Sequence, residues 1–190
     1  MSNTPITRYL VVDLEATCDD QGTVPREESE IIEIGAVLVD GATLEPIDEF
    51  QTFVRPLLHP RLTTFCTRLT TITQADVQRA PTFKSVAPRL AAFGRDALFC
   101  SWGAYDKNQI EREARRARIA APLGTRHLNL KQAFADAAGD PPTGNGSALR
   151  RVGLKPTGTA HRGIDDARNI ARLLPFALGR RPVPAAPSRR

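Results

Sequence analysis

A chain of 190 residues, 41% hydrophobic and 25% charged, has the size and composition of one globular domain with a sizeable core. No uninterrupted apolar run approaches the ~20 residues of a membrane-spanning helix, and residues 1–5 lack the basic and apolar regions of a signal peptide. The three cysteines are widely spaced and unlike zinc ligands, so we expect reduced thiols and a cytoplasmic protein with no membrane partner.

The net charge of +5 conceals an asymmetry. Residues 1–60 contain 12 acidic and 3 basic side chains, whereas residues 61–190 contain 9 acidic and 23 basic ones. A basic majority beside an acidic region is typical of a nuclease, because the bases attract phosphates and the acids bind metal. For any single arginine, a solvent-exposed helix face is the simpler explanation.

The first strand predicted along the chain leads into two carboxylates. Residues 9–12 are apolar with strong strand character, and Asp13 and Glu15 follow with one leucine between them. Side chains alternate across a strand, so the two acids point to the same side. They repel each other unless a cation lies between them, and carboxylate oxygens suit Mg²⁺ or Mn²⁺ better than zinc. Taken alone, the pair more often marks only the solvated end of a strand.

Two more strands are expected in the first third of the chain. After a polar loop over residues 19–29, residues 30–39 and 47–54 have strand patterns. Their short connections favour antiparallel pairing. Pro56 ends the third strand, because it lacks a donor for the hydrogen-bond ladder.

The polar segment over residues 62–73 has two interpretations. Phe65, Leu69 and Ile72 have helical spacing, which favours core contacts. The many hydroxyl groups instead favour a loop beside a site, where Phe65 is free to stack on a base. The residues alone do not decide between the two.

The remaining chain alternates helical patterns with short apolar segments. The expected elements are a helix over residues 83–93, a strand over 97–101, a helix over 106–119, a short element passing into a helix over 128–134, a helix over 147–153 and a long helix over 162–178. Asp106 stands at the head of an apolar helical face. A carboxylate there is partly buried, which is costly without a partner.

The last helix carries a second inward carboxylate. Asp166 shares a face with the apolar residues four, seven and eleven positions later. Asp165 points about 100° away and is expected to face solvent or cap the helix. His161 lies on the entering loop, where it can reach the same site. The tail over residues 179–190, with three prolines and four arginines, is expected to be flexible.

These residues resemble those of a known family. The ordered set Asp13-x-Glu15, Asp106 and His161-x₄-Asp166 resembles the DEDD superfamily of 3′→5′ exonucleases, and the histidine resembles its DEDDh (DnaQ-like) branch. Further motifs resemble the Eri-type RNA exonucleases. They are Asp13-Leu14-Glu15-Ala16-Thr17-Cys18, Glu30-Ile31-Ile32-Glu33-Ile34-Gly35, Phe65-Cys66-x₂-Leu69-Thr70, Ser101-Trp102-Gly103 and the run from His161 to Ala171.

The resemblance implies an α/β, RNase H-like fold, in which a mixed five-stranded sheet has helices on both faces. It implies an exonuclease domain over residues 7–178, followed by the flexible basic tail over 179–190. It further implies two Mg²⁺ ions, with Mn²⁺ possible, whose ligands would be Asp13, Glu15, Asp106 and Asp166.

The implied chemistry is hydrolysis of the last phosphodiester. Two cations about 4 Å apart can activate the attacking water and stabilise the leaving oxygen. A histidine, with a reference pKa of about 6.5, can take the proton from that water, and His161 is the implied base.

The implied substrate contacts are residues of the quoted motifs. By resemblance, Ala16 and Thr17 lie beside the terminal sugar and Phe65 and Trp102 flank its base. Leu69 and His161 are further implied substrate contacts. A core position remains the alternative for Trp102. Thr71 and Ala104 depart from the usual glycine and the usual carboxylate or amide, which affects substrate preference rather than the ligand set.

We therefore predict a metal-dependent 3′→5′ exonuclease of single-stranded ends. RNA is preferred over DNA, and nucleoside 5′-monophosphates are released. Two alternatives remain: a DNA-directed exonuclease of the proofreading or repair type, and a non-catalytic nucleic-acid-binding module. The presence of all four carboxylates disfavours the second.

Overall fold

Five strands form one mixed sheet in the order β3-β2-β1-β4-β5. In the computed structural model, which describes residues 6–185, β1 (Arg8–Ala16), β2 (Ile31–Asp40) and β3 (Pro46–Phe53) pair antiparallel. The short strands β4 (Leu98–Ser101) and β5 (His127–Asn129) continue the sheet in parallel. The expected mixed five-stranded sheet is confirmed. Two predictions fall outside the described residues. They concern residues 1–5, which lack a signal-peptide pattern, and residues 186–190 at the end of the predicted tail.

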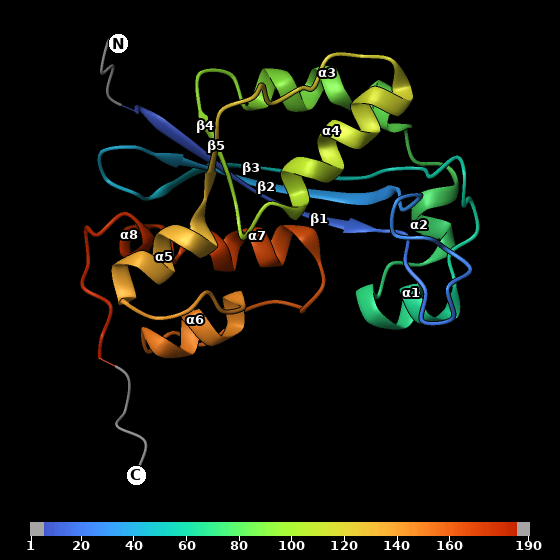
Figure 1. Ribbon diagram of the computed structural model, residues 1–190. Helices are drawn as coiled ribbons and strands as arrows, with labels where there is room; N and C mark the ends of the chain where they lie inside the picture. Colours follow the sequence, from blue (N-terminus) through green and yellow to red (C-terminus); the bar gives the residue numbers. More distant parts are fainter. Residues whose placement is uncertain (1–5, 186–190) are drawn as a thin grey trace.

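Eight helices within residues 6–185 surround the sheet (Figure 1). They are α1 (Thr64–Thr70), α2 (Gln74–Gln78), α3 (Phe83–Phe93), α4 (Tyr105–Ala117), α5 (Leu130–Ala138), α6 (Asn145–Arg151), α7 (Gly163–Ala171) and α8 (Leu174–Ala177). Helices α3 and α4 cover one face, α5 to α8 lie on the other, and α1 and α2 lie beyond one end of the sheet. Among residues 6–185, none of these helices has the length and apolarity that a bilayer crossing requires.

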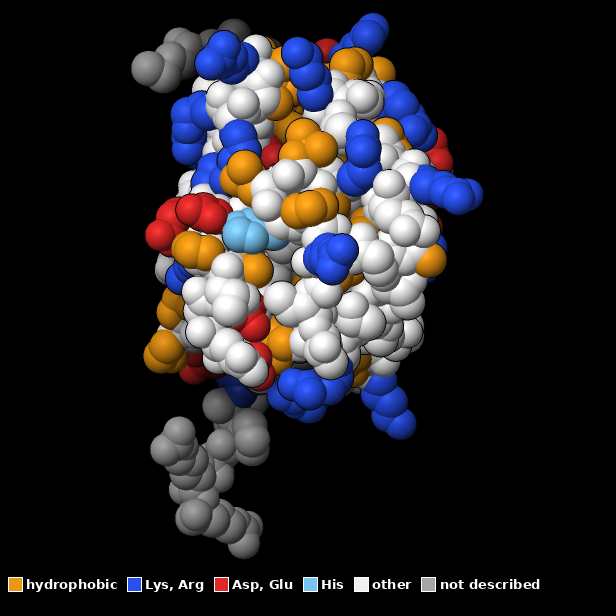
Figure 2. Space-filling view, turned by 90° about the vertical axis from the view of Figure 1, so that its right-hand side faces the viewer, with side chains coloured by type: hydrophobic (Ala, Val, Ile, Leu, Met, Phe, Trp, Pro, Cys, Tyr) orange, Lys and Arg blue, Asp and Glu red, His pale blue; other side chains and the backbone are white. Residues whose placement is uncertain are grey.

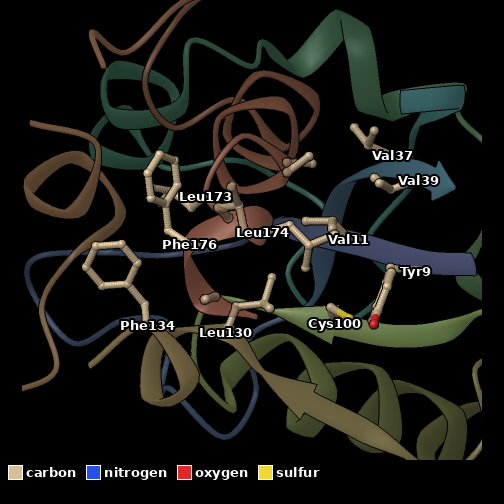
Figure 3. Packing of buried hydrophobic residues seen from close by; sticks show 14 of the residues in the cluster. Tyr9, Val11, Val37, Val39, Cys100, Leu130, Phe134, Leu173, Leu174 and Phe176 are labelled. Carbon is tan, nitrogen blue, oxygen red and sulfur yellow. The ribbon is translucent and has the colours of Figure 1, made fainter. Parts of the chain in front are cut away.

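The alternation of side chains in β1 divides the core in two. Leu10 and Val12 pack towards α3 and α4, whereas Tyr9 and Val11 pack towards α5, α7 and α8. Figure 3 shows this second cluster, in which Val11 lies near Leu174 of α8. Strand β2 is buried along almost its whole length, because helices cover both faces of the sheet there.

Within the segment over residues 62–73, residues 64–70 form helix α1, so the loop interpretation is wrong for this part. Thr63 caps α1 by accepting a hydrogen bond from the Cys66 amide, and Thr71 ends the helix with a left-handed backbone. Ile72 is buried in a small cluster with Cys66, but Leu69 remains 36% exposed. The core interpretation therefore holds for only part of the set.

The predicted helix over residues 162–178 is broken into two. Helix α7 ends at Ala171 and α8 begins at Leu174. Pro175 is the second residue of α8, and proline has no amide donor and clashes with the preceding turn of a continuous helix. Beyond α8, Val183 packs against the core. This part of the predicted flexible tail therefore has a tertiary contact.

The surface reflects the charge asymmetry of the chain. On the face in Figure 2, Lys and Arg side chains are distributed widely, while Asp and Glu side chains gather mainly along one side. The basic surface is thus available for a polyanion.

Candidate active site

The end of β1 carries the first two predicted acids. Asp13 and Glu15 follow Tyr9 and Val11 at every second position of β1, so the four side chains point to the face of the sheet that α7 covers. Regular pairing with β2 is interrupted immediately afterwards, because the register shifts between Glu15 and Ala16. Pairing continues past this bulge, since Ala16 lies opposite Ile31 and the Thr17 backbone amide donates to the Glu30 carbonyl oxygen at 2.8 Å.

Helix α7 brings the third acid to this place through a contact between two glycines. A Cβ atom on Gly35 would lie 2.1 Å from the carbonyl carbon of Gly163, so only glycine fits there. One turn into α7, Asp166 meets the β1 pair. A carboxylate oxygen of each of Asp13, Glu15 and Asp166 lies within 4.8 Å of the others.

The fourth acid, Asp106, approaches from the start of α4. It is only 4% exposed, and its Oδ1 accepts a hydrogen bond of 3.1 Å from the backbone amide of Leu14. That amide lies between Asp13 and Glu15 in the chain. The structure thus brings all four predicted acids to the end of β1, with three of them in one tight group and Asp106 against the strand.

This cluster concentrates negative charge in a buried place. Burial, followed by the charges of Asp106 and Glu15, raises the pKa of Asp13 well above its ordinary value. Burial and the neighbouring Asp166 and Glu33 raise the pKa of Glu15 to about 8. Among residues 6–185, no Lys or Arg forms an ion pair with any of the four cluster acids. A hard divalent cation is the partner that such a set of oxygens fits.

His161 lies at the edge of the cluster, on a turn before α7. Its backbone amide donates to Asp166 Oδ2 at 2.8 Å, its backbone is left-handed (φ 58°), and the residue is exposed. The neighbouring Asp165 accepts from the Thr159 amide and from Arg168, which places it outside the cluster.

Asn145 was not found from the sequence. It begins α6, and its side-chain amide donates to Asp166 Oδ1 at 3.3 Å. The Gly144-Asn145-Gly146 run predicts only a loop, and no local pattern connects it to a residue 21 positions later.

The predicted sugar contacts, Ala16 and Thr17, lie at the end of β1. Thr17 is buried and its hydroxyl accepts from the Glu30 amide at 2.9 Å. The Ala16 carbonyl oxygen accepts a weak bond from the Cys66 thiol at 3.7 Å, which holds α1 against the end of β1. Their role toward a sugar stays a prediction.

The other predicted substrate contacts, Phe65, Leu69 and Trp102, differ in their exposure and in the contacts they already make. Phe65 and Leu69 project from α1 with partly exposed side chains. Trp102 instead donates its indole N–H to the Thr143 carbonyl at 2.9 Å and packs on Phe134, with ring centroids 5.8 Å apart. The core alternative for Trp102 therefore has direct support, although its ring remains partly exposed.

The family model for exonucleases of the RNase T type matches residues 10–174. The chain belongs to this exonuclease family. The DEDDh and Eri-type resemblance seen in the motifs is confirmed by similar proteins and structures of that kind.

Among curated proteins, this exonuclease-family chain is similar to ERI1 exoribonuclease 3 of Bos taurus, with 33% identity over 189 residues, 92% of this chain and 55% of the relative. It is 30% identical to the 3′-5′ exonuclease eri1 of Schizosaccharomyces pombe, over 90% of this chain and 68% of the relative. The chain thus spans only about half the length of the first of these relatives.

Among solved structures, the nuclease domain of 3′hExo, a DEDDh family member bound to rAMP, superimposes with a TM-score of 0.83. It is 29% identical and the match covers 91% of this chain and 92% of that one. A 3′-exonuclease in a structure concerning recognition of the histone mRNA stem-loop has a TM-score of 0.82, 29% identity and coverage of 92% and 64%. The RNase H-like fold is confirmed by these matches.

Proposed function

We propose that this chain is a divalent-metal-dependent 3′→5′ exonuclease of single-stranded ends, which prefers RNA to DNA and releases nucleoside 5′-monophosphates. The observation that carries the proposal is the group of three carboxylates within 4.8 Å that has no basic ion-pair partner in residues 6–185. Similarity to proteins named exoribonucleases, and to a structure with bound rAMP, supports RNA as the substrate. The catalytic domain is proposed to span residues 7–178.

The acids at the end of β1 are the proposed ligands. Asp13, Glu15 and Asp166 would hold two Mg²⁺ or Mn²⁺ ions, and Asp106 would complete the set from the start of α4. When bound, such ions supply an activated water and stabilise the leaving 3′ oxygen.

The remaining roles belong to the chain itself. The bond from the His161 amide to Asp166 keeps this turn beside the cluster, while the exposed imidazole is free to take a proton from the attacking water. Ala16 and Thr17 are proposed to contact the terminal sugar. Phe65 and Trp102 are proposed to contact its base, since stacking accepts any base, and Leu69 is proposed as a further substrate contact.

The first prediction tests the ligand set. Asp166→Asn keeps the shape of the side chain but removes one charge, so Mg²⁺-dependent nucleotide release should fall at least about a hundredfold. The measurement is release of the 3′-terminal nucleotide from 3′-labelled RNA and DNA of one sequence. Asp165→Asn is the matched control, because this adjacent acid lies outside the cluster.

Three results would count against the proposal. Wild-type activity in Asp166→Asn would remove the metal assignment, and faster release from DNA than from RNA would remove the RNA preference. A product other than a nucleoside 5′-monophosphate would exclude the proposed hydrolysis of the bond between phosphorus and the 3′ oxygen.

A further inference from the structure

Glu33 is a fully buried carboxylate on β2 that lies opposite Glu15 in the strand register. Its two oxygens accept four hydrogen bonds. The donors are the Gln51 amide at 2.8 Å, the Arg162 guanidinium at 3.0 and 3.1 Å, and the Gly163 backbone amide at 3.0 Å. A buried charge with this many donors is well satisfied, and loss of any donor would be costly.

Two of those donors come from the residues that directly follow His161. Arg162 is the N-cap residue of α7, and its guanidinium also lies 5.4 Å from the centre of the Phe53 ring. Gly163 is the first residue of α7. On the other side of the same turn, the His161 amide is bound to Asp166. The turn that carries the histidine is therefore bound to two carboxylates, Asp166 and Glu33, although the His161 side chain is exposed.

We propose that Glu33 is a positioning residue, which acts through Arg162 and Gly163 to fix the turn that carries His161. This inference rests on the proposed function, because the position of the turn affects catalysis only if His161 is the base. A planar guanidinium that donates two bonds to one carboxylate defines direction as well as distance. It thereby fixes the backbone one residue away from the proposed base.

Helix α7 has other anchors that do not depend on Glu33. Ile164, Ala167 and Ile170 are buried against the sheet, and the Gly35 contact holds its first residue. Arg168 forms a second, exposed bridge to Glu49 on β3, with N–O distances of 3.0 and 2.6 Å. Loss of the Glu33 charge should consequently loosen the turn more than it displaces Asp166. Turnover, rather than metal or substrate binding, should respond.

The test compares Glu33→Gln with Glu49→Gln, which breaks the other bridge from α7 to the sheet. For Glu33→Gln we expect kcat to fall about ten- to a hundredfold, part of the ~10²–10⁴ that general-base catalysis contributes. KM for RNA and Mn²⁺ affinity by calorimetry should change by less than about threefold, since binding energy is not the interaction removed. Glu49→Gln should match the wild type in all three.

A double-mutant cycle separates positioning from a structural role. If Glu33 acts through His161, then Glu33→Gln should cost less than about threefold in kcat when His161 is already alanine, because the two effects are coupled. An equal loss in both backgrounds would overturn the proposal, as would wild-type kcat in Glu33→Gln.

A second measurement does not depend on activity. Amide hydrogen exchange at His161 and Gly163 should accelerate at least about tenfold in Glu33→Gln, while exchange in the rest of α7 stays unchanged. Unchanged exchange would overturn the positioning role even if the wild type released no nucleotide, an outcome that would separately refute the proposed function. If Glu33→Gln does not fold, Arg162→Lys retains the charge but loses the planar pair of donors, and should show the same pattern more weakly.

Discussion

At the scale of single residues, the active-site candidates are acids kept in a place that disfavours their charge. Asp13 lies among Glu15, Asp106 and Asp166, and each of these raises its pKa further above the value that burial alone would give. A natural partner that relieves this repulsion is a cation, because neither arginine nor lysine pairs with the cluster within residues 6–185. Metal and protons should therefore compete for the same oxygens.

This competition predicts how stability depends on pH. The pKa of Glu15 rises from 4.5 to about 8 on folding. Between these values the unfolded chain binds fewer protons than the folded one, so metal-free protein should lose stability as pH rises from about 4.5 to about 8. The stabilisation that comes from the protonated Glu15 carboxyl is fully present below pH 4.5 and absent above about pH 8.

Chemical unfolding at pH 5, 6.5 and 8.5, with and without Mg²⁺, measures this effect. Glu15→Gln removes the titrating group, so the free energy of unfolding should depend less steeply on pH in the variant. Added Mg²⁺ should stabilise the wild type more at pH 8.5 than at pH 5. Identical pH slopes in the two proteins would contradict the prediction.

At the scale of elements, the site depends on how closely α7 lies on the sheet. The Gly35–Gly163 contact has no room for a side chain, and a Cβ on Gly163 would also lie 2.9 Å from the Asp13 carbonyl oxygen. Helix α7 thus rests directly on β1 and β2 beside the two strand acids. The break before Pro175 is a separate feature, which lets α8 turn into the core.

Gly35→Ala should therefore displace α7 from the sheet. We expect the free energy of unfolding to fall by about 3 kcal/mol, at the upper end for overpacking, because the added methyl meets backbone atoms. Mn²⁺ affinity should also fall about tenfold as Asp166 moves away from the β1 acids.

Gly146→Ala is the matched control, since it adds the same methyl within α6 where the nearest atom, of Arg150, is 3.7 Å away. This variant should be as stable as the wild type or more so. If Gly35→Ala had the same free energy of unfolding and the same Mn²⁺ affinity as the wild type, the contact would not be what holds Asp166 in place.

At the scale of the whole molecule, an acidic site is set within a basic protein. The net charge is +5, although the first 60 residues alone contain 12 acids and 3 bases. Basic side chains are spread over the face in Figure 2 rather than gathered in one patch. The positive electrostatic potential of such a surface attracts a polyanion without reading its sequence, which suits the proposed exonuclease.

The binding of longer strands should therefore depend on salt. Between 50 and 200 mM salt, KM for a single-stranded RNA decamer should rise about ten- to twentyfold if roughly three phosphates are neutralised. A dinucleotide, with one internal phosphate, is the control and should respond much less. Equal salt dependence for both substrates would exclude contacts beyond the terminal nucleotide.

The sequence by itself determined the features that local periodicity encodes. Alternation in a strand places Asp13 and Glu15 on one side, and helical spacing turns Asp106 and Asp166 inward, so all four acids were found before the fold. Pro175 also indicates a break in the last helix. The apolar pattern around it favoured one continuous helix instead, and that prediction was wrong.

Only the tertiary structure decided which distant side chains meet. The hydroxyl-rich residues 64–70 form a helix, in which Cys66 packs with the nearby Ile72 in a small buried cluster. Arg162 reaches Glu33 across 129 positions, and Asn145 reaches Asp166 from another helix. A residue's own neighbours determine the direction of its side chain, but the packing of whole elements determines its partner.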